Sequence, residues 1–475
     1  MSVLVVPIGA GVGSVAAAPI PWLVLAAVAV AALLDRRLLL LTLAVGCWTS
    51  ALAHRSLDGL DAPIEVGRVE ATATLVRDPR TFGSATVVDV SLDGRRYEVS
   101  AFGGARFVLA EARLGDRIVI IGERSPPRPG DRSWFRPRHV AGRIVADRVS
   151  RPLGAATPFA LANEVHDRLR EGAASLADDE RALFLGLVVG DDREQSHEVR
   201  ERWRAAGLSH LLAVSGQNVA FVLLLAGPLL RRLPPAPRLL AVGALLAFFV
   251  ILTRIEPSVS RAAVMAGLVA AVDVAGRPTS TIRVLSTAVV VLLLVDPLLV
   301  WSVGFRLSVA ATLGIAVLHP WFRRRVPGPR WWRDAVSVTV AAQLGVAPLL
   351  LATFGPVPLA SLPANLLAGP VAGAVMVWGA TAGLLAGFAP DGVAAVLHVP
   401  TGLGVRWIDG VARVTTELDL PELGAGALIA VVGAAIVVGA AVGRRGLERR
   451  ARRRPLTPPL ASRSVSDGRD QVSGG

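Results

Sequence analysis

The chain has 475 residues, of which 53% are hydrophobic and 18% are charged, and its formal net charge is +13. Soluble domains are about 45–50% apolar and about a quarter charged. The composition therefore excludes a disordered protein, a fibrous repeat and an ordinary soluble enzyme. Because the apolar residues gather in long uncharged blocks, we predict an integral membrane protein. With one cysteine, Cys47, the chain can form neither an internal disulfide nor a cysteine-based metal cluster.

Residues 1–55 are predicted to form an N-terminal transmembrane hairpin. Two apolar stretches, 16–34 and 38–53, are separated by Asp35, Arg36 and Arg37. The N-terminus lacks the charged start of a signal peptide. Because arginines beside membrane spans stay on the cytoplasmic side, we expect Arg36 and Arg37 inside, with the N-terminus and the residues after 55 outside.

Residues 62–151 are expected to form a small extracellular β-barrel. The Asp93-Gly94 pair signals a hairpin turn, and the flanking stretches are rich in β-branched residues. An OB-like barrel is one candidate, and barrels of this type often bind single-stranded nucleic acid. The predicted strands are 66–76, 85–92, 95–101, 116–122 and 142–149.

The end of this region, residues 124–151, is strongly basic, with eight arginines and two acids. Arginines interleaved with aromatic residues suit a groove that follows a nucleic-acid backbone and stacks its bases. A solvated face, or a segment attracted to anionic lipid, is the alternative interpretation. The candidate DNA-binding residues are Arg124, Arg128, Arg132, Trp134, Phe135, Arg136, Arg138 and Arg143.

Residues 158–205 are predicted to form amphipathic helices at the membrane interface. Leu161, Val165 and Leu169 recur at helical spacing. The apolar run from Ala182 to Gly190 is too short to cross a bilayer.

Residues 206–442 are predicted to hold the main set of membrane spans, and residues 443–475 a basic, disordered cytoplasmic tail. Arginines cluster in alternate connections, which places those connections in the cytoplasm. An even number of crossings is then needed between 356 and 424: either 359–388 crosses twice, or it crosses once and 393–409 crosses back. The candidate spans are 208–230, 239–253, 259–275, 284–300, 304–319, 335–352, 359–388 and 425–442.

Polar residues inside these spans are costly and often line a cavity. Gly216 would weaken a helix, and a broken membrane helix must face protein or water, so the segment around it is expected to border an aqueous path. Helix caps, interhelical hydrogen bonds and interfacial loops are the alternative roles. Arg261 is expected either to contact phosphates or to pair with Asp296. The candidate channel-lining residues are His210, Ser215, Gly216, Gln217, Asn218, Arg261, Asp296, Arg306, Gln343 and Asn365.

Five ordered segments, spread over roughly residues 60–440, resemble the ComEC family of DNA-internalisation competence proteins. The run at 182–219 contains ALFLGLVVGDD and ends in GLSHLLAVSGQNV. The segment RPGDRSWFRPRHVAGRI (128–144) is similar to the end of the family's extracellular OB-like domain. The other matching segments are PSVSRAAVMAGL (257–268), DPLLVWSVGFRLSVAATLGI (296–315) and AAQLGVAPLLLATFGPVPLASLPANLLAGP (341–370).

The resemblance implies a polytopic α-helical membrane protein with an inserted extracellular OB-like barrel and a competence-type channel domain at 206–442. Its implied function is an inner-membrane channel that passes one strand of transforming DNA into the cytoplasm. Membrane lipid, a cytoplasmic helicase motor, an extracellular DNA receptor, a separate nuclease and a second copy of the chain are implied partners. No cofactor, metal or catalytic residue is expected.

Two other function classes stay open at this point. A small-solute or lipid transporter would also use polar residues at membrane depth. His210 and Ser215 could be imagined as an intramembrane protease dyad, but positions five apart diverge around a regular helix. Many family members add a metallo-β-lactamase-like domain, which needs clustered His and Asp ligands for two metals. The seven histidines here lie far apart in sequence, so no nuclease activity is expected.

Overall fold

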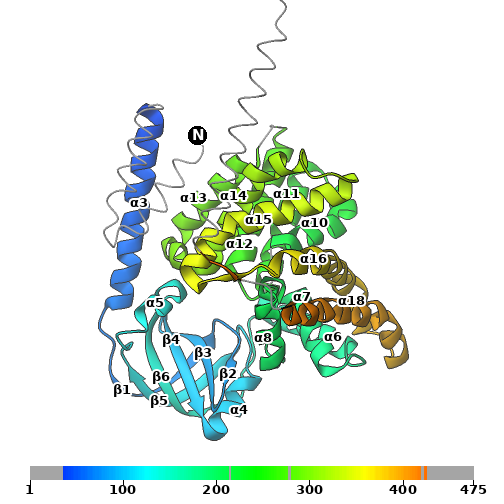
Figure 1. Cartoon of the computed structure of the whole chain (residues 1–475). Helices are drawn as coiled ribbons and strands as arrows, with labels where there is room; N and C mark the ends of the chain where they lie inside the picture. Colours follow the sequence, from blue (N-terminus) through cyan, green and yellow to red (C-terminus); the bar gives the residue numbers. More distant parts are fainter. Residues whose placement is uncertain (1–35, 213–215, 277–279, 419–421, 425–475) are drawn as a thin grey trace, which may run out of the picture. The chain divides into compact units, whose positions relative to one another are not determined.

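The computed structural model describes residues 36–212, 216–276, 280–418 and 422–424 (Figure 1). The apolar stretch 16–34, Ser215, the predicted span 425–442 and the tail 443–475 lie outside these residues. The first described element, α3 (Arg36–Asp61), corresponds to the second half of the predicted hairpin. It continues six residues past the predicted end at 55, because Arg95 donates to the carbonyl oxygens of Gly59 (2.7 Å) and Ala62 (2.8 Å) and so caps its last turn.

Residues 67–149 form a closed five-stranded barrel, which confirms the OB-like prediction. The strands are β1 (Gly67–Leu75), β3 (Ala85–Leu92), β4 (Arg95–Phe102), β5 (Arg117–Ser125) and β6 (Val140–Val149). Their order is β1-β5-β6-β4-β3, and pairing of β1 with β3 closes the ring. All pairs are antiparallel except β4 with β6.

Two short elements of the barrel were not predicted. Helix α4 (Gly103–Glu111) connects β4 to β5 and places Leu109 in the barrel core. Strand β2 (Arg80–Phe82) pairs with the first residues of β3 as an additional strand. Alternate residues of β3 and β4 fill that core, among them Val88, Val90 and Val99. The residues between them therefore face outward.

Helices α6 (Thr157–Gly172), α7 (Asp178–Val189) and α8 (His197–Ala205) follow the barrel. The structure differs from the prediction of an interfacial surface for this whole segment. Every residue of α7 from Ala182 to Val189 is buried, and with Trp203 of α8 these residues form the centre of a large apolar cluster. A helix that is apolar on all sides packs inside a bundle rather than at a surface.

Helix α9 (Ser209–Leu212) is followed by α10 (Gly216–Leu230), and the predicted break in the first span of the main set stays a prediction. The connection between them lies outside the described residues. The remaining helices of this set are α11 (Pro235–Leu252), α12 (Pro257–Val274), α13 (Thr281–Val295), η2 (Pro297–Trp301), α14 (Val303–Arg323), α15 (Arg330–Phe354), α16 (Ser361–Trp378), η3 (Gly379–Gly383), α17 (Leu384–Ala386) and α18 (Asp391–Glu417).

Five described helices are long and apolar enough to cross a membrane: 235–252, 257–274, 303–323, 330–354 and 361–386. The segment predicted at 359–388 is one continuous helix, with a π-helical turn at Gly379–Gly383, so it does not cross twice. Helix α18 packs back against α16. It carries exposed apolar side chains, including Val396, Leu403 and Trp407, on the side away from its buried residues, as expected of a helix in contact with lipid.

Helices α14 and α15 pack closely through two glycines. A Cβ at Gly314 would lie 2.5 Å from the carbonyl oxygen of Ala341, and a Cβ at Gly345 would lie 2.6 Å from that of Ala310. Small residues at such positions let two membrane helices approach each other. Near the end of this region, β7 (Val357–Pro358) pairs with β8 (Glu422–Leu423).

Candidate nucleic-acid interface and membrane site

The basic segment, residues 124–151, runs from the end of β5 through β6 and includes the connection between them, which OB folds commonly use in nucleic-acid binding. It contains α5 (Arg132–Phe135) and the 3-10 turn η1 (Arg136–Arg138). Arg128, Arg132 and Trp134 are exposed, and Trp134 has two thirds (66%) of its surface accessible. Arg132 lies 3.8 Å from Asp61, a distance that holds an exposed pair only loosely.

The inner half of the segment is neutralised by acids of the barrel wall. Arg138 bridges Asp89 and Glu98, with its Nε 2.8 Å from Asp89 and its Nη1 3.0 Å from Glu98. Burial lowers the pKa of Arg138, but the hydrogen bonds and attraction of the two carboxylates outweigh burial and raise it above its ordinary value. Arg143 donates to Glu98 and to Asp131, at 3.1 Å each. These arginines therefore hold the barrel wall together.

Two further members of the predicted DNA-binding set differ from expectation. Phe135 is only 3% exposed and lies beneath the guanidinium groups of Arg138 (5.6 Å) and Arg143 (5.8 Å), so its ring offers no face for a base. Arg124 is paired with Glu65 at 2.7 Å. Sequence alone marks these residues as basic or aromatic, but their acidic partners come from distant strands.

The end of the basic segment contacts the membrane helices. His139 Nε2 lies 3.0 Å from both carboxylate oxygens of Asp296, which follows α13, and the Arg136 guanidinium lies 5.8 Å from the Trp301 ring of η2. Asp296 also accepts a hydrogen bond from Leu298 N (3.0 Å). Asp296 is thus a cap and the partner of His139, and its predicted pairing with Arg261 is wrong.

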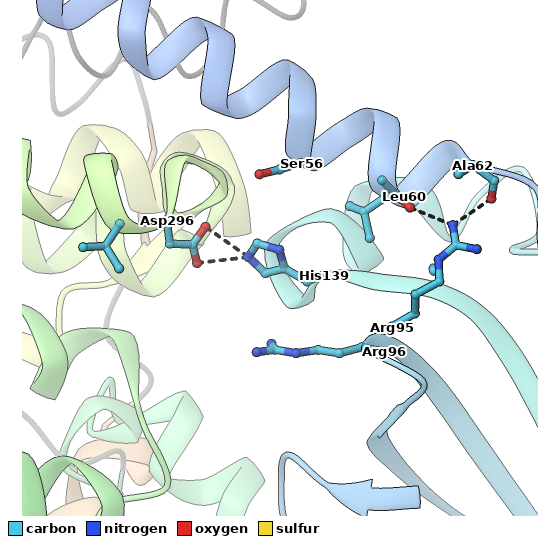
Figure 2. A pocket seen from close by; sticks show the side chains of 11 residues that line it. Ser56, Leu60, Ala62, Arg95, Arg96, His139 and Asp296 are labelled. Atoms are coloured by element: carbon cyan, nitrogen blue, oxygen red, sulfur yellow. Dashed lines mark hydrogen bonds and ion pairs between the residues drawn. The ribbon is translucent and has the colours of Figure 1, made fainter. Parts of the chain in front are cut away.

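Next to this contact is a cleft of about 640 Å³ between the end of α3, the barrel and the end of α13. Figure 2 shows Arg96 and the His139–Asp296 pair pointing into it, while Arg95 turns to the carbonyl groups at the end of α3. Arg96 donates to the carbonyl oxygen of Arg138 (3.2 Å). The cleft therefore has charged walls at the junction of the barrel with the helices.

In the membrane helices, Arg261 of α12 is the most informative predicted residue. It is 6% exposed, its Nε donates to Ser308 Oγ of α14 (2.8 Å), and its Nη1 lies 2.9 Å from Met265 Sδ. Ser308 is also 3.3 Å from Ser258 Oγ. Among the described residues, no carboxylate forms an ion pair with Arg261. A buried cation beside hydroxyl and thioether groups only is suited to receive an anion.

The start of α10 lies beside this cation. A Cβ at Gly216 would be 3.0 Å from Ala262 Cβ and 3.4 Å from Arg261 Nη2. The structure therefore brings together Gly216, Arg261 and Ser308, which we call the arginine cluster.

The other predicted channel residues lie in different settings. Asn218 is buried and donates to the carbonyl oxygen of Leu187 in α7 (3.2 Å). Asn365 donates to the carbonyl oxygen of Ser361 one turn earlier, at 2.7 Å. These two side chains therefore stabilise helices and their contacts. His210, Gln217 and Arg306 are exposed and Gln343 is half-buried.

An ion-pair network that sequence reasoning missed joins the barrel to the helices. Asp78, after β1, accepts a hydrogen bond from Leu114 N (2.7 Å) and lies 2.8 Å from Arg254 Nε. Arg254 connects α11 to α12 with a left-handed φ of 60°, and its Nη1 donates to Asn163 Oδ1 of α6 (2.7 Å). Few non-glycine residues adopt this conformation, which costs of order 1–3 kcal/mol, so the side-chain contacts help to hold it.

Asp191 is the second centre of the network. It is 4% exposed and lies 2.6 Å from Arg193, 3.2 Å from Arg170 and 3.6 Å from His166 Nδ1. Burial raises the pKa of Asp191, but hydrogen bonds and attraction from Arg193 and His166 outweigh burial and hold it well below its usual range. The sequence could have indicated this ion pair, because Asp191 follows the buried helix α7 closely and a buried carboxylate needs a partner.

No group of three or more potential metal ligands occurs among the described residues.

Comparison with known proteins places this geometry in context. The family model described as competence protein matches residues 187–449. The uncharacterized protein YcaI of Escherichia coli K12 is 30% identical over 207 residues, 40% of this chain and 27% of YcaI. ComE operon protein 3 of Bacillus subtilis 168 is 29% identical over 212 residues, 44% of this chain and 27% of that protein. The chain thus matches about a quarter of the length of each relative. No solved structure matches.

Proposed function

Because the chain belongs to the ComEC family of competence proteins, we propose that it is a membrane channel that passes single-stranded transforming DNA into the cytoplasm. It is a multi-pass membrane protein, and five helices of its described part are suited to crossing a bilayer. In this proposal the barrel lies outside the cell, the tail at 443–475 lies in the cytoplasm, and the chain itself performs no catalysis. A helicase motor, an extracellular DNA receptor and a separate nuclease are its proposed partners.

The observation that carries the proposal is the buried charge of Arg261. Keeping a cation at membrane depth is costly, and among the described residues its guanidinium hydrogen-bonds to the uncharged groups Ser308 Oγ and Met265 Sδ and forms no ion pair. An anion that arrives only during transport would offset this cost without a permanent partner. Phosphate diesters of a nucleic-acid strand fit this role, because arginine binds phosphate through two parallel hydrogen bonds.

The barrel favours a nucleic acid over a small solute. Its strand order, with a parallel pair and a helix between β4 and β5, is that of an OB fold, which binds oligonucleotides through a strand face and two loops. The exposed residues Arg128, Arg132 and Trp134 lie on one of these loops. A transporter of small solutes or lipids, which Arg261 alone would also suit, has no use for such a surface.

The arrangement supports a two-step path. Exposed arginines collect strand phosphates without sequence preference, since their interaction is electrostatic. The strand then passes to the membrane helices, where Arg261 contacts one phosphate at a time. Contacts that are few and weak enough to be exchanged allow the strand to move on.

The test is DNA binding by the full chain in lipid nanodiscs over a salt series. The variant Arg128→Glu, Arg132→Glu, Arg136→Glu should weaken binding of oligo-dT and reduce the slope of log K against log salt by about 2, at ~0.7 per lost phosphate contact. The matched control reverses three exposed arginines of the helices, Arg200, Arg204 and Arg324. An unchanged slope, or an equal effect of the control, would show that the basic segment does not bind the strand.

A further inference from the structure

Three large aromatic side chains are exposed at one end of the barrel. Phe82 ends β2, Phe102 ends β4, and Phe107 lies on α4, with 61%, 50% and 61% of their surfaces accessible. We call these residues the aromatic end. Burying a phenylalanine gains about 1.5–3 kcal/mol, a gain that these three forgo in the free protein. These three residues were not predicted as a site from the sequence, because β2 and α4 were not predicted.

The strand register places two of these rings in one row. Phe82 pairs with Ala85 of β3, and Ala85 pairs with Phe102 of β4. Directly paired residues project to the same side, and this side is the outer one, because Val88 and Val90 on the alternate parity face the core. Strands lie about 4.8 Å apart, so the phenylalanines stand roughly 10 Å apart across a small alanine. The row therefore presents two exposed rings on the outer face with a small alanine between them.

Arg106 connects this row to the third ring. Its guanidinium carbon lies 4.5 Å from the centre of the Phe107 ring, and its Nη1 donates to the carbonyl oxygen of Gly83, the neighbour of Phe82 (3.2 Å). Arg80, on the same outward side of β2 as Phe82, has 58% of its side chain accessible and lies 3.2 Å from Asp192. A flat cation and a second arginine thus accompany the aromatic rings.

We propose that the aromatic end is a stacking site for the bases of single-stranded nucleic acid, an inference that rests on the proposed function. Unpaired bases have free faces that stack on aromatic rings and on guanidinium planes, and each stacked base contributes about 1–3 kcal/mol. Arg106 and Arg80 are placed to contact the phosphates between the bases. Duplex DNA does not fit the site, because its base faces are already stacked on each other.

The middle of the same outer face is closed by Arg138 and its partners Asp89 and Glu98. The stacking site is therefore separate from the exposed part of the basic segment, which supplies phosphate contacts rather than base contacts. A strand that uses both is held by its bases at one end of the face and by its backbone at the other.

The test compares two single-stranded probes of equal length, oligo-dT and an abasic oligonucleotide, with the full chain in nanodiscs. The wild type should bind oligo-dT at least about tenfold more tightly, since only this probe has bases to stack. Phe82→Leu, Phe102→Leu, Phe107→Leu should remove this preference and leave abasic binding and the salt slope unchanged. Leucine keeps the site apolar, so a surface that docks a protein or a bilayer would tolerate the change.

The control variant is Phe354→Leu, an exposed phenylalanine at the end of α15. If the triple variant keeps the wild-type preference for oligo-dT, or loses abasic binding to the same extent, the stacking site is refuted while the DNA-binding function stands. If the wild type binds neither probe at low salt, the proposed function falls and the stacking site falls with it. Single leucine variants, which disturb the barrel least, should each remove part of the preference.

Discussion

In the barrel, Arg138 lies between the carboxylates of Asp89 and Glu98, whereas in the membrane helices Arg261 lies beside Ser308 and Met265. Both arginines are largely removed from solvent, but within the part of the chain that the structure describes only the barrel arginine has carboxylate partners. A cation that is paired within the fold contributes to stability, and one that is left without a counter-charge is available to a ligand. We expect this difference to separate structural arginines from those that bind the strand.

The largest effect on stability is expected from Arg138→Ala. This change leaves two buried carboxylates with weaker partners and should lower the free energy of unfolding of the barrel by about 3 kcal/mol. Hydrogen exchange of β3 and β4 in the full chain measures the loss. Arg132→Ala, at an exposed site, is the control and should cost less than about 0.5 kcal/mol. Equal protection of both variants would show that Arg138 is not a structural residue.

Asp191→Asn should weaken the contacts that Asp191 makes with Arg193, Arg170 and His166, at a cost of about 2 kcal/mol. The pKa of Asp191 is lower in the folded than in the unfolded chain, where it is about 3.9, so its stabilisation is complete above that pH and is lost as the pH falls through the folded value. In thermal unfolding, the difference between wild type and variant should stay constant from pH 8 to 5 and shrink below about pH 4. A difference that already shrinks between pH 7 and 5 would contradict this assignment.

The smallest effect is expected from single exposed arginines of the basic segment. Arg132→Ala should weaken oligo-dT binding a few-fold and reduce the salt slope by about 0.7, with no change in stability. Arg143→Ala should lower stability and leave oligo-dT binding and the salt slope unchanged, because its guanidinium is paired with Glu98 and Asp131. Binding by each variant at three salt concentrations decides between the two. A reduced slope for Arg143→Ala in a folded chain would place DNA on the inner half of the segment.

The sequence was sufficient to predict the barrel, because strand periodicity and the Asp93-Gly94 turn are local signals. It was also sufficient for most helix positions. It failed where the outcome depends on distant partners: Phe135 looked like a stacking residue until Arg138 and Arg143 were seen to cover it. Likewise, the link between Asp78 and Arg254 joins residues 176 positions apart, and no local pattern reveals such a pair.

The central claim is that Arg261 contacts the strand as it passes the membrane. The most direct measurement is the ionic current through the full chain in a planar bilayer, with oligo-dT added on the barrel side. We predict transient current blocks for the wild type, at least about tenfold fewer for Arg261→Gln at unchanged open current, and partial recovery for Arg261→Lys, which keeps the charge. Equal block frequencies for wild type and Arg261→Gln would contradict the account, as would a wild-type current that oligo-dT never blocks.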